Sequence, residues 1–225
     1  MNQDPLPQPS KIICVGQNYT AHVLELGNGI PTEPVLFQKA PSSWAAPFAP
    51  LPLPPGAEKL DYEVELGVVI GKRMQRVPEE EALDHVEGYL VLCDYSERGW
   101  QKERGGQWNK GKSHDGFCPA GPKIVPASEI GDPQNLHIWS KVKGEIRQNS
   151  NTSDMIFSVK EVLSYISQFM TLLPGDVVAT GTPGGVGAGM KPPQFLKVGD
   201  VVELGIEGIG EIKQEIISTP GSESR

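Results

Sequence analysis

Cysteine is scarce in this chain of 225 residues, which holds Cys14, Cys93 and Cys118 and no C-x-x-C pair. A zinc site built from paired cysteines and a disulfide scaffold are therefore not indicated. We expect each isolated cysteine to fill a core or loop position as a small apolar side chain. This usage favours a reducing compartment, and a cytoplasmic protein is expected.

Long apolar runs and runs of positive charge are missing as well. No window approaches the ~20 apolar residues of a membrane-spanning helix. The polar, proline-rich start, residues 1–10, does not have the charged-then-apolar order of a secretory signal. The formal net charge is −8, from 20 Lys and Arg against 28 Asp and Glu. Neither a membrane nor nucleic acid is therefore expected as a partner.

Glycine and proline, by contrast, are abundant, with 26 and 21 residues, which indicates many turns rather than long helices. Helices are predicted over 18–26, over 78–86 and, from its apolar stripe, over 158–170, where Ser158 and Glu161 form a capping box. Apolar, β-branched runs predict strands over 11–16, 63–70, 88–93, 136–142, 176–180, 201–206 and 210–217.

Together these elements predict one β-rich α+β domain over residues 11–217. Residues 1–10 are predicted to be a flexible lead-in, and residues 218–225 a C-terminal tail. The proline-rich stretch 41–56 is predicted to be an extended loop that crosses the surface.

Carboxylates alternate along the start of the strand predicted over 63–70. In Asp61-Tyr-Glu-Val-Glu-Leu-Gly-Val-Val-Ile-Gly71, the acids Asp61, Glu63 and Glu65 fall on one face of an extended chain. Like charges on a core-bound strand are costly unless a cation neutralises them. An oxygen-only ligand set suits Mg²⁺, Mn²⁺ or Ca²⁺. From this segment alone, a strand edge that faces water explains the acids equally well.

Another acid follows the strand predicted over 88–93. Asp94 stands where that strand leaves the sheet, and it can complete a metal site begun by the two glutamates. Arg98 and Gln101 follow on the next turn, at a spacing that puts both on one face if that turn is helical. Arg98 is a candidate for bidentate binding of a substrate carboxylate. A helix-capping aspartate and a solvated arginine are the alternative.

Two glycine-containing loops carry further candidates. Lys110 and Lys112 follow the acid-rich segment, and a lysine beside a carboxylate–metal site can stabilise an anionic substrate or an enolate. In Thr180-Gly-Thr-Pro-Gly-Gly-Val-Gly187, the backbone around Gly181 and the hydroxyl of Thr182 can form an anion-binding concavity. The G-K-[ST] ending of a nucleotide-binding loop is absent. Ordinary surface turns are the alternative for both loops.

His22 and Glu25 lie three residues apart in the helix predicted over 18–26, so they share one face. A carboxylate that orients an imidazole is a standard arrangement for a general base that activates water. A structural or exposed histidine is the alternative.

Taken in order, these motifs resemble the fumarylacetoacetate hydrolase superfamily. The likeness is closest to its short members that act as acylpyruvate hydrolases, oxaloacetate decarboxylases or 2-hydroxymuconate-type isomerases. Each motif alone is weak, but their order along the chain makes the resemblance specific. The segments that carry it are 16–25, 61–71, 93–101, 111–122, 144–157 and 180–187.

The resemblance implies a mixed β-sandwich roll, a homodimer, and an Mg²⁺ (or Mn²⁺) ion held by Glu63, Glu65 and Asp94. Asp61 is then not a ligand. The resemblance also implies roles for the remaining residues. Lys112 and Gln101 reach the substrate or the metal-bound water, and His22 with Glu25 forms the catalytic pair on a lid. The acid end of the substrate is bound by Arg98, Gly181 and Thr182.

The predicted activity follows from these parts. A metal-chelated 2-oxo acid forms an enolate as a bond at its third carbon breaks. The His22–Glu25 pair favours hydrolysis of a β-diketo acid, and oxaloacetate decarboxylation is the second activity considered. The alternative is an isomerase or hydratase that acts on a 2-hydroxymuconate or a 2-oxohept-3-ene-dioate. A non-catalytic protein that binds a metal or a small acid is the alternative from another class.

Overall fold

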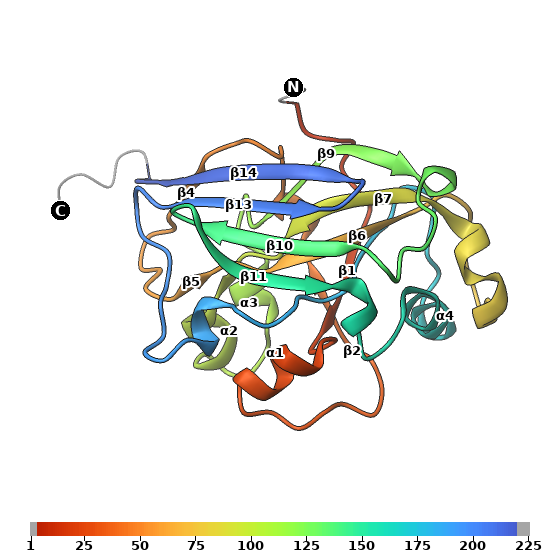
Figure 1. Ribbon diagram of the computed structural model, residues 1–225, viewed down its shortest axis with the longest axis horizontal. Helices are drawn as coiled ribbons and strands as arrows, with labels where there is room; N and C mark the ends of the chain where they lie inside the picture. The colour runs from red at the N-terminus through yellow and green to blue at the C-terminus, as the bar shows by residue number, and fades with distance from the viewer. Residues whose placement is uncertain (1–3, 220–225) are drawn as a thin grey trace.

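The computed structural model describes residues 4–219, and its strands form two facing β-sheets (Figure 1). Residues 1–3 and 220–225, which belong to the predicted lead-in and tail, lie outside the described residues. The larger sheet has seven strands in the order β2-β1-β12-β6-β7-β9-β3, the smaller has five in the order β11-β10-β13-β14-β4, and β5 pairs with β8.

The strands are β1 (Ile12–Gly16), β2 (Val35–Lys39), β3 (Trp44–Ala45), β4 (Leu51–Pro52), β5 (Leu60–Asp61), β6 (Val64–Ile70), β7 (Val86–Cys93), β8 (Ser96–Glu97), β9 (Cys118–Pro126), β10 (His137–Val142), β11 (Glu145–Asn151), β12 (Val177–Ala179), β13 (Val201–Ile206) and β14 (Gly210–Ile217). The α-helices are α1 (Thr20–Glu25), α2 (Arg98–Lys102), α3 (Asn109–Lys112) and α4 (Val159–Phe169). The 3₁₀ helices are η1 (Pro41–Ser43), η2 (Glu79–His85), η3 (Ala127–Glu129), η4 (Thr152–Asp154) and η5 (Gly187–Gly189).

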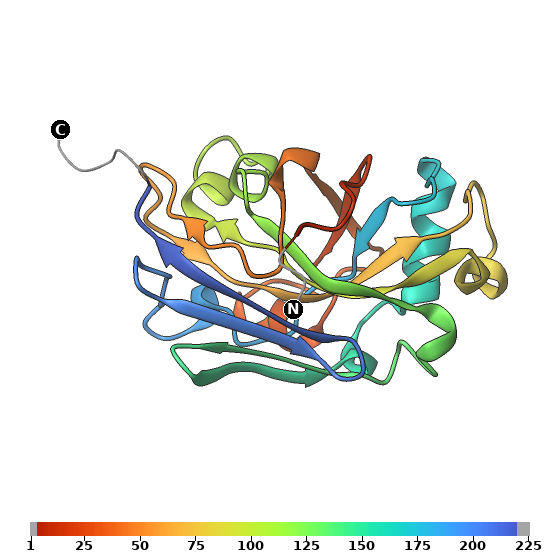
Figure 2. The same ribbon diagram turned by 90° about the horizontal axis from the view of Figure 1, so that it is seen from above.

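The main hydrophobic core lies between the two sheets, which appear as separate layers when the molecule is seen from above (Figure 2). Every residue of β6 is buried, so its apolar run is continuous rather than alternating. In β14, by contrast, buried and exposed residues alternate because its outer face is in water. A second, smaller cluster that includes Ile12, Leu90 and Ala120 covers the other face of the large sheet.

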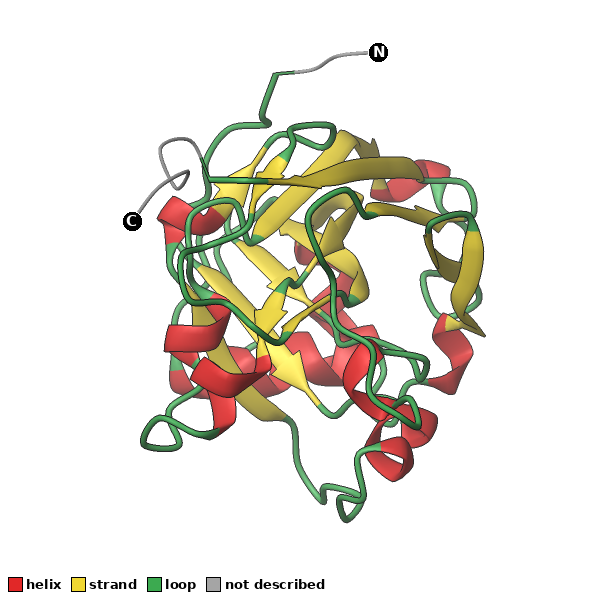
Figure 3. Cartoon of the chain, turned by 90° about the vertical axis from the view of Figure 1, so that its left-hand side faces the viewer, coloured by secondary structure: helices red, strands yellow, loops and turns green. Residues whose placement is uncertain are grey.

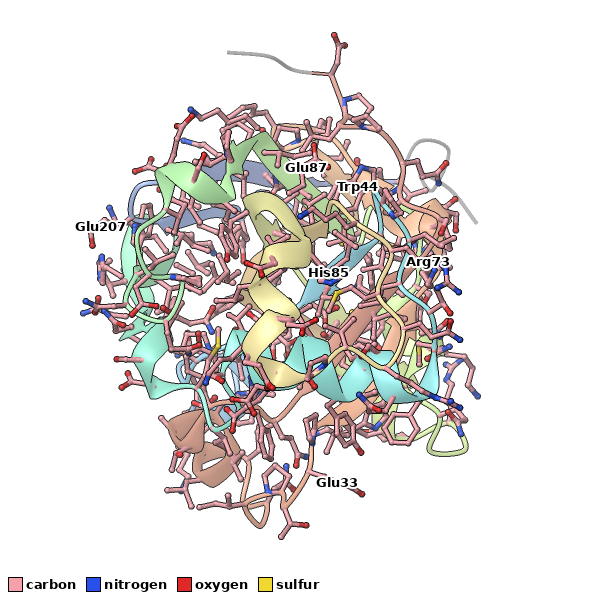
Figure 4. The ribbon with its side chains drawn as sticks, turned by 90° about the vertical axis from the view of Figure 1, so that its right-hand side faces the viewer. Glu33, Trp44, Arg73, His85, Glu87 and Glu207 are labelled. Atoms are coloured by element: carbon pink, nitrogen blue, oxygen red, sulfur yellow. The ribbon has the colours of Figure 1, made fainter. Side chains whose placement is uncertain are left out.

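Helix α4 begins and is held as its sequence predicts. The Ser158 side chain accepts from the backbone of Glu161, whose carboxylate accepts from the backbone of Ser158, which completes the capping box. Its buried face packs beside η2, and Figure 4 shows the two helices together on one side of the molecule. Below them, the labelled Glu33 accepts a 2.8 Å hydrogen bond from the hydroxyl of Tyr165 in α4. Phe169 belongs to the apolar stripe that the sequence predicts over 158–170 but is exposed, so the prediction that it is buried is wrong.

The predicted β-rich α+β class is confirmed, and strands 201–206 and 210–217 have the predicted bounds. The helix predicted over 78–86 is the 3₁₀ helix η2 (Glu79–His85) rather than an α-helix. The proline-rich stretch 41–56 is mostly extended, but it contributes η1 and the two-residue strands β3 and β4. Strands β2, β9 and β11 and helices α2 and α3 were not predicted. Within residues 4–219, no helix is both long and apolar enough to span a membrane.

The pairing of four strands explains where functional groups gather. Strand β1 is parallel to β12, β12 is antiparallel to β6, and β6 is antiparallel to β7. The ends of β1, β12 and β7 therefore meet the start of β6 at one edge of the large sheet. Helices α1, α2 and α3 lie against this edge, at the bottom of Figure 1, and Figure 3 shows helices below the strands from a second side.

Candidate active site

Three buried carboxylates lie together at this sheet edge. Glu63 precedes β6, Glu65 lies within it, and Asp94 follows β7. The pairing of Val64 with Cys93 brings the two segments into register. One oxygen from each carboxylate lies within 4.8 Å of the other two, and all three side chains are buried. We call these residues the acid triad.

Two buried lysines neutralise part of the charge of the acid triad. The Lys112 Nζ lies 2.6 Å from Glu63 Oε2 and 2.5 Å from Asp94 Oδ2. The Lys39 Nζ lies 2.5 Å from Asp94 Oδ1, and it also donates to the backbone carbonyls of Tyr95 and Lys112. Lys112 was predicted for this site because it lies in the glycine-containing loop that follows the acid-rich segment. Lys39 was not predicted. The one feature of the sequence that could have indicated it is its position at the end of the apolar segment Val35–Lys39.

The two glutamates of the triad have opposite pKa shifts. Burial acts to raise the pKa of Glu63, but the charges of Lys112 and Arg98 outweigh it and hold the pKa below its ordinary value. For Glu65, burial and then the neighbouring charges of Asp94 and Glu63 all act in one direction, and its pKa is raised well above the ordinary value.

Glu65 is thus the carboxylate of the triad with too little positive charge around it. Its Oε2 accepts a 2.8 Å hydrogen bond from the backbone N–H of Gly181. A divalent cation among the three carboxylates would supply the missing charge, and their oxygen donors are the ones that Mg²⁺ and Mn²⁺ prefer. The residues present therefore fit such an ion.

Asp61 points to Arg98 rather than joining the triad. Its Oδ2 lies 2.9 Å from both Nε and Nη2 of Arg98, and its oxygens also accept from the backbone N–H groups of Gly187 and Ala188. Arg98 Nη2 lies 2.7 Å from Glu63 Oε1 as well. Arg98 thus links the acid triad to the glycine-rich loop. Its predicted contact with a substrate carboxylate stays a prediction.

Arg98 also fixes the orientation of Gln101. The Nη1 group of Arg98 donates to Gln101 Oε1 at 3.1 Å. An amide whose oxygen accepts in this way presents its NH₂ group to the remaining space. Because Gln101 lines the cavity described below, it offers that space a hydrogen-bond donor.

His22 and Glu25 are in contact, as their spacing predicts. The His22 Nδ1 lies 2.8 Å from Glu25 Oε1, and Glu25 Oε2 accepts a 2.8 Å hydrogen bond from the backbone N–H of Gly185. Glu25 therefore holds the imidazole and also ties α1 to the glycine-rich loop. With Nδ1 engaged, Nε2 is the imidazole nitrogen left for a ligand.

The hydrogen-bond donors predicted for the glycine-rich loop are already engaged. The N–H of Gly181 donates to Glu65, and the Thr182 hydroxyl donates to the carbonyl of Val64 at 2.9 Å. Buried Gln148, which was not predicted, donates to Thr182 Oγ1 at 2.7 Å. In this structure the loop therefore supports the acid triad, and its binding of a substrate stays a prediction.

A cavity of about 310 Å³ brings these groups together. Its polar lining residues include Glu63, Glu65, Arg98, Gln101, Lys112 and His22, and its apolar lining residues include Val15, Leu26, Phe37 and Trp108. The rings of Phe37 and Trp108 pack edge to face, 5.3 Å between centroids. A small acid that has both charged and apolar parts fits this mixed lining. Three residues predicted for the site do not line the cavity but contact residues that do. Glu25 contacts His22, Gly181 contacts Glu65, and Asp94 contacts Lys112.

Comparison with known proteins adds three kinds of finding. The family model for the fumarylacetoacetate (FAA) hydrolase C-terminal domain matches residues 11–217. A protein of Burkholderia cenocepacia, named only provisionally as a hydrolase, is 52% identical over 202 residues, which cover 89% of this chain and 72% of that protein.

Two solved structures are similar over most of this chain. A fumarylacetoacetate hydrolase from Exiguobacterium antarcticum has 43% sequence identity and a TM-score of 0.88, over 94% of this chain and 76% of that one. A 2-hydroxyhepta-2,4-diene-1,7-dioate isomerase from Mycobacterium marinum has 38% identity and a TM-score of 0.83, over 95% and 76%. The predicted family and its β-rich fold are thereby confirmed.

Proposed function

The chain belongs to the fumarylacetoacetate hydrolase family, and on that premise we propose that it is a metal-dependent hydrolase that cleaves a carbon–carbon bond of an acylpyruvate. The observation that carries the proposal is that Glu63 and Glu65 of the acid triad line one cavity with His22, which Glu25 orients from behind. A cation site supports an anionic leaving group, and the pair supports activation of water.

Glu63, Glu65 and Asp94 would hold the ion, and their oxygen donors favour Mg²⁺ or Mn²⁺. When bound, the ion would supply Lewis-acid stabilisation of negative charge on the 2-oxo acid. Lys112 adds a second positive charge beside the same carboxylates, where it can hold an anionic group of the substrate. The amide of Gln101 is placed to orient the substrate by donating a hydrogen bond.

Water activation falls to His22. Its Nε2 takes a proton from water as the water oxygen bonds to the 4-oxo carbon, and Glu25 stabilises the imidazolium that results. The bond between the third and fourth carbons then breaks, and its electron pair stays with the pyruvate fragment as an enolate. The same imidazole can return the proton to the third carbon. Atoms and charge balance, and the products are pyruvate and a carboxylic acid.

An isomerase is the second candidate, because the similar structure from Mycobacterium marinum carries that name. Isomerisation needs the same enolate but only moves a proton, without addition of water. Hydrolysis needs a base that activates water, and isomerisation needs a base that moves a proton, whereas decarboxylation of oxaloacetate needs neither. The His22–Glu25 pair at 2.8 Å therefore favours hydrolysis over decarboxylation, and the hydrolase name of the Burkholderia cenocepacia relative is the reason to rank hydrolysis before isomerisation.

A single comparison of substrates tests the proposal. The purified protein with Mg²⁺ is incubated with acetylpyruvate, oxaloacetate or a 2-hydroxymuconate, and loss of the enol absorbance is followed together with pyruvate and carbon dioxide. We expect pyruvate and acetate from acetylpyruvate, and none after addition of EDTA. A protein that converts only the 2-hydroxymuconate, with no change in mass, would be an isomerase.

A further inference from the structure

One cation of the cavity has no carboxylate partner among the described residues. Arg98 is bonded to Asp61 and Glu63, and Lys112 is bonded to Glu63 and Asp94. Lys102 lines the same cavity, and its ammonium has no ion pair within residues 4–219.

Lys102 ends α2, directly after Gln101, and it is exposed where the other cations of the cavity are buried. It therefore stands toward the mouth of the cavity, away from the buried triad. The adjacent carboxylate of Glu103 does not neutralise it, because Glu103 is paired with Lys59 at 2.5 Å. Positive charge at the mouth is left unmatched.

The electrostatic surroundings of Lys102 agree with this reading. Desolvation by neighbouring groups, followed by repulsion from the charge of Arg98, lowers the pKa of Lys102 from its ordinary value, although the side chain is exposed. The carboxylates that act in the other direction, Glu63 and Asp61, are themselves bonded to Arg98. An anionic group from a ligand would remove this imbalance.

We propose that Lys102 selects substrates that carry a second carboxylate, at the end of the chain opposite the 2-oxo acid. This inference rests on the proposed function, which places the 2-oxo acid end at the triad. The distal carboxylate then lies at the mouth and pairs with Lys102, while the apolar wall of Phe37 and Trp108 contacts the methylene or vinyl carbons between. The substrate class is a 2-oxo or 2,4-dioxo dicarboxylic acid.

The test compares two acids that differ only at the far end. For turnover the pair is 2,4-dioxoheptanedioate and 2,4-dioxoheptanoate, and for binding without turnover it is 2-oxoheptanedioate and 2-oxoheptanoate, each with Mg²⁺. The variants are Lys102→Gln, which removes the charge, and Lys102→Arg, which keeps it. Lys72→Gln, at an exposed lysine outside the cavity, is the matched control.

For the wild type and the control we expect kcat/KM and affinity to favour the dicarboxylate. Lys102→Gln should remove about tenfold of that preference, which corresponds to about 1.4 kcal/mol. The loss should appear as a higher KM for the dicarboxylate, with kcat and the monocarboxylate nearly unchanged, and Lys102→Arg should restore it.

An unchanged preference in Lys102→Gln, or an equal loss for both acids, would overturn the role of Lys102 and leave the proposed function standing. Binding of neither 2-oxo acid by the wild-type protein would overturn the proposed function, and this inference with it. Titration calorimetry on the non-reactive pair gives the second readout, independent of turnover.

Discussion

Lys39 donates a 2.5 Å hydrogen bond to Asp94, and neither side chain is exposed to solvent. The remaining contacts of the ammonium are carbonyl oxygens, those of Tyr95 and Lys112. One buried charge thus orients a triad carboxylate and also holds the backbone that carries Lys112. Lys39 acts through these residues and does not line the cavity, so it is a positioning residue.

Replacing Lys39 by Met should destabilise the protein strongly. Removal of one partner of a buried ion pair typically costs about 3–5 kcal/mol, and the variant leaves Lys112 as the remaining lysine that compensates the charge of Asp94. Urea unfolding in EDTA measures the change, and Lys72→Met at an exposed site is the control. Added Mg²⁺ should recover part of the loss. Equal unfolding free energies for Lys39→Met and the wild type would contradict the positioning role.

Replacing Glu65 by Gln should abolish the stabilisation that Mg²⁺ confers. The wild-type melting temperature should rise with Mg²⁺, since a ligand that binds only the native state stabilises it. The variant should show no rise, because the triad has lost one anionic ligand. Without Mg²⁺ the variant should be at least as stable as the wild type, since the ionised Glu65 is crowded by Asp94 and Glu63.

Glu87→Gln, an exposed glutamate labelled in Figure 4, is the matched control for that experiment. Circular dichroism must show that the Glu65 variant is folded. A variant that still gains the wild-type shift with Mg²⁺ would remove Glu65 from the ligand set.

Replacing Ser158 by Ala should cost about 1 kcal/mol of unfolding free energy at pH 7, the usual loss for a helix cap. The difference should shrink in acid. Hydrogen bonds from the hydroxyl and N–H of Ser158 lower the folded-state pKa of Glu161, so its stabilisation is present above the unfolded value of 4.5. It is lost as the pH falls through the folded pKa.

Thermal unfolding between pH 7 and pH 3 measures this dependence, with Ser128→Ala as an exposed control. A difference between Ser158→Ala and wild type that stays constant across this range would show that Glu161 does not contribute through its charge.

Elements with a regular apolar pattern were the predictable part of the fold. Strand β14 alternates buried and exposed residues, and α4 has a capping box, so both follow from local sequence. Strand β9 was missed because Pro119, Gly121 and Pro122 interrupt its pattern, and its pairing to β7 is irregular there. Tertiary pairing overrides local preference at such positions.

The site shows the same limit. The triad was predictable because its members follow recognisable strand motifs, and His22 with Glu25 because a helix turn brings them together. Lys39 and Gln148 could not be predicted, because their partners are distant in the sequence. Asp94 lies 55 residues from Lys39, and Thr182 lies 34 residues from Gln148. The sequence also does not show that the Thr182 hydroxyl already donates a hydrogen bond, because its acceptor, the carbonyl of Val64, is distant in the chain.

The protein should be a homodimer, as its family resemblance implies. Light scattering coupled to size exclusion, at micromolar concentration, should give twice the chain mass of 24.4 kDa. A mass that stays at that of one chain up to 100 μM, roughly the upper end for stable assemblies of micromolar affinity, would contradict the prediction.

Replacing His22 by Ala should separate hydrolysis from metal binding. Loss of a general base typically costs on the order of 10²–10⁴-fold in rate, and the triad does not contain His22, so Mg²⁺ affinity should persist. Glu25→Gln should give a smaller loss than His22→Ala, because the imidazole remains but its 2.8 Å partner no longer carries charge. Rates with acetylpyruvate and calorimetry with Mg²⁺ supply the two measurements.

Oxaloacetate provides the discriminating comparison for His22. Decarboxylation needs no activated water, so His22→Ala should reduce it less than it reduces acetylpyruvate hydrolysis. Equal losses in both reactions would mean that α1 acts by closing over the substrate, held by the bond from Gly185 to Glu25. Full activity of the variant in both reactions would show that His22, although buried beside the triad, is not the base.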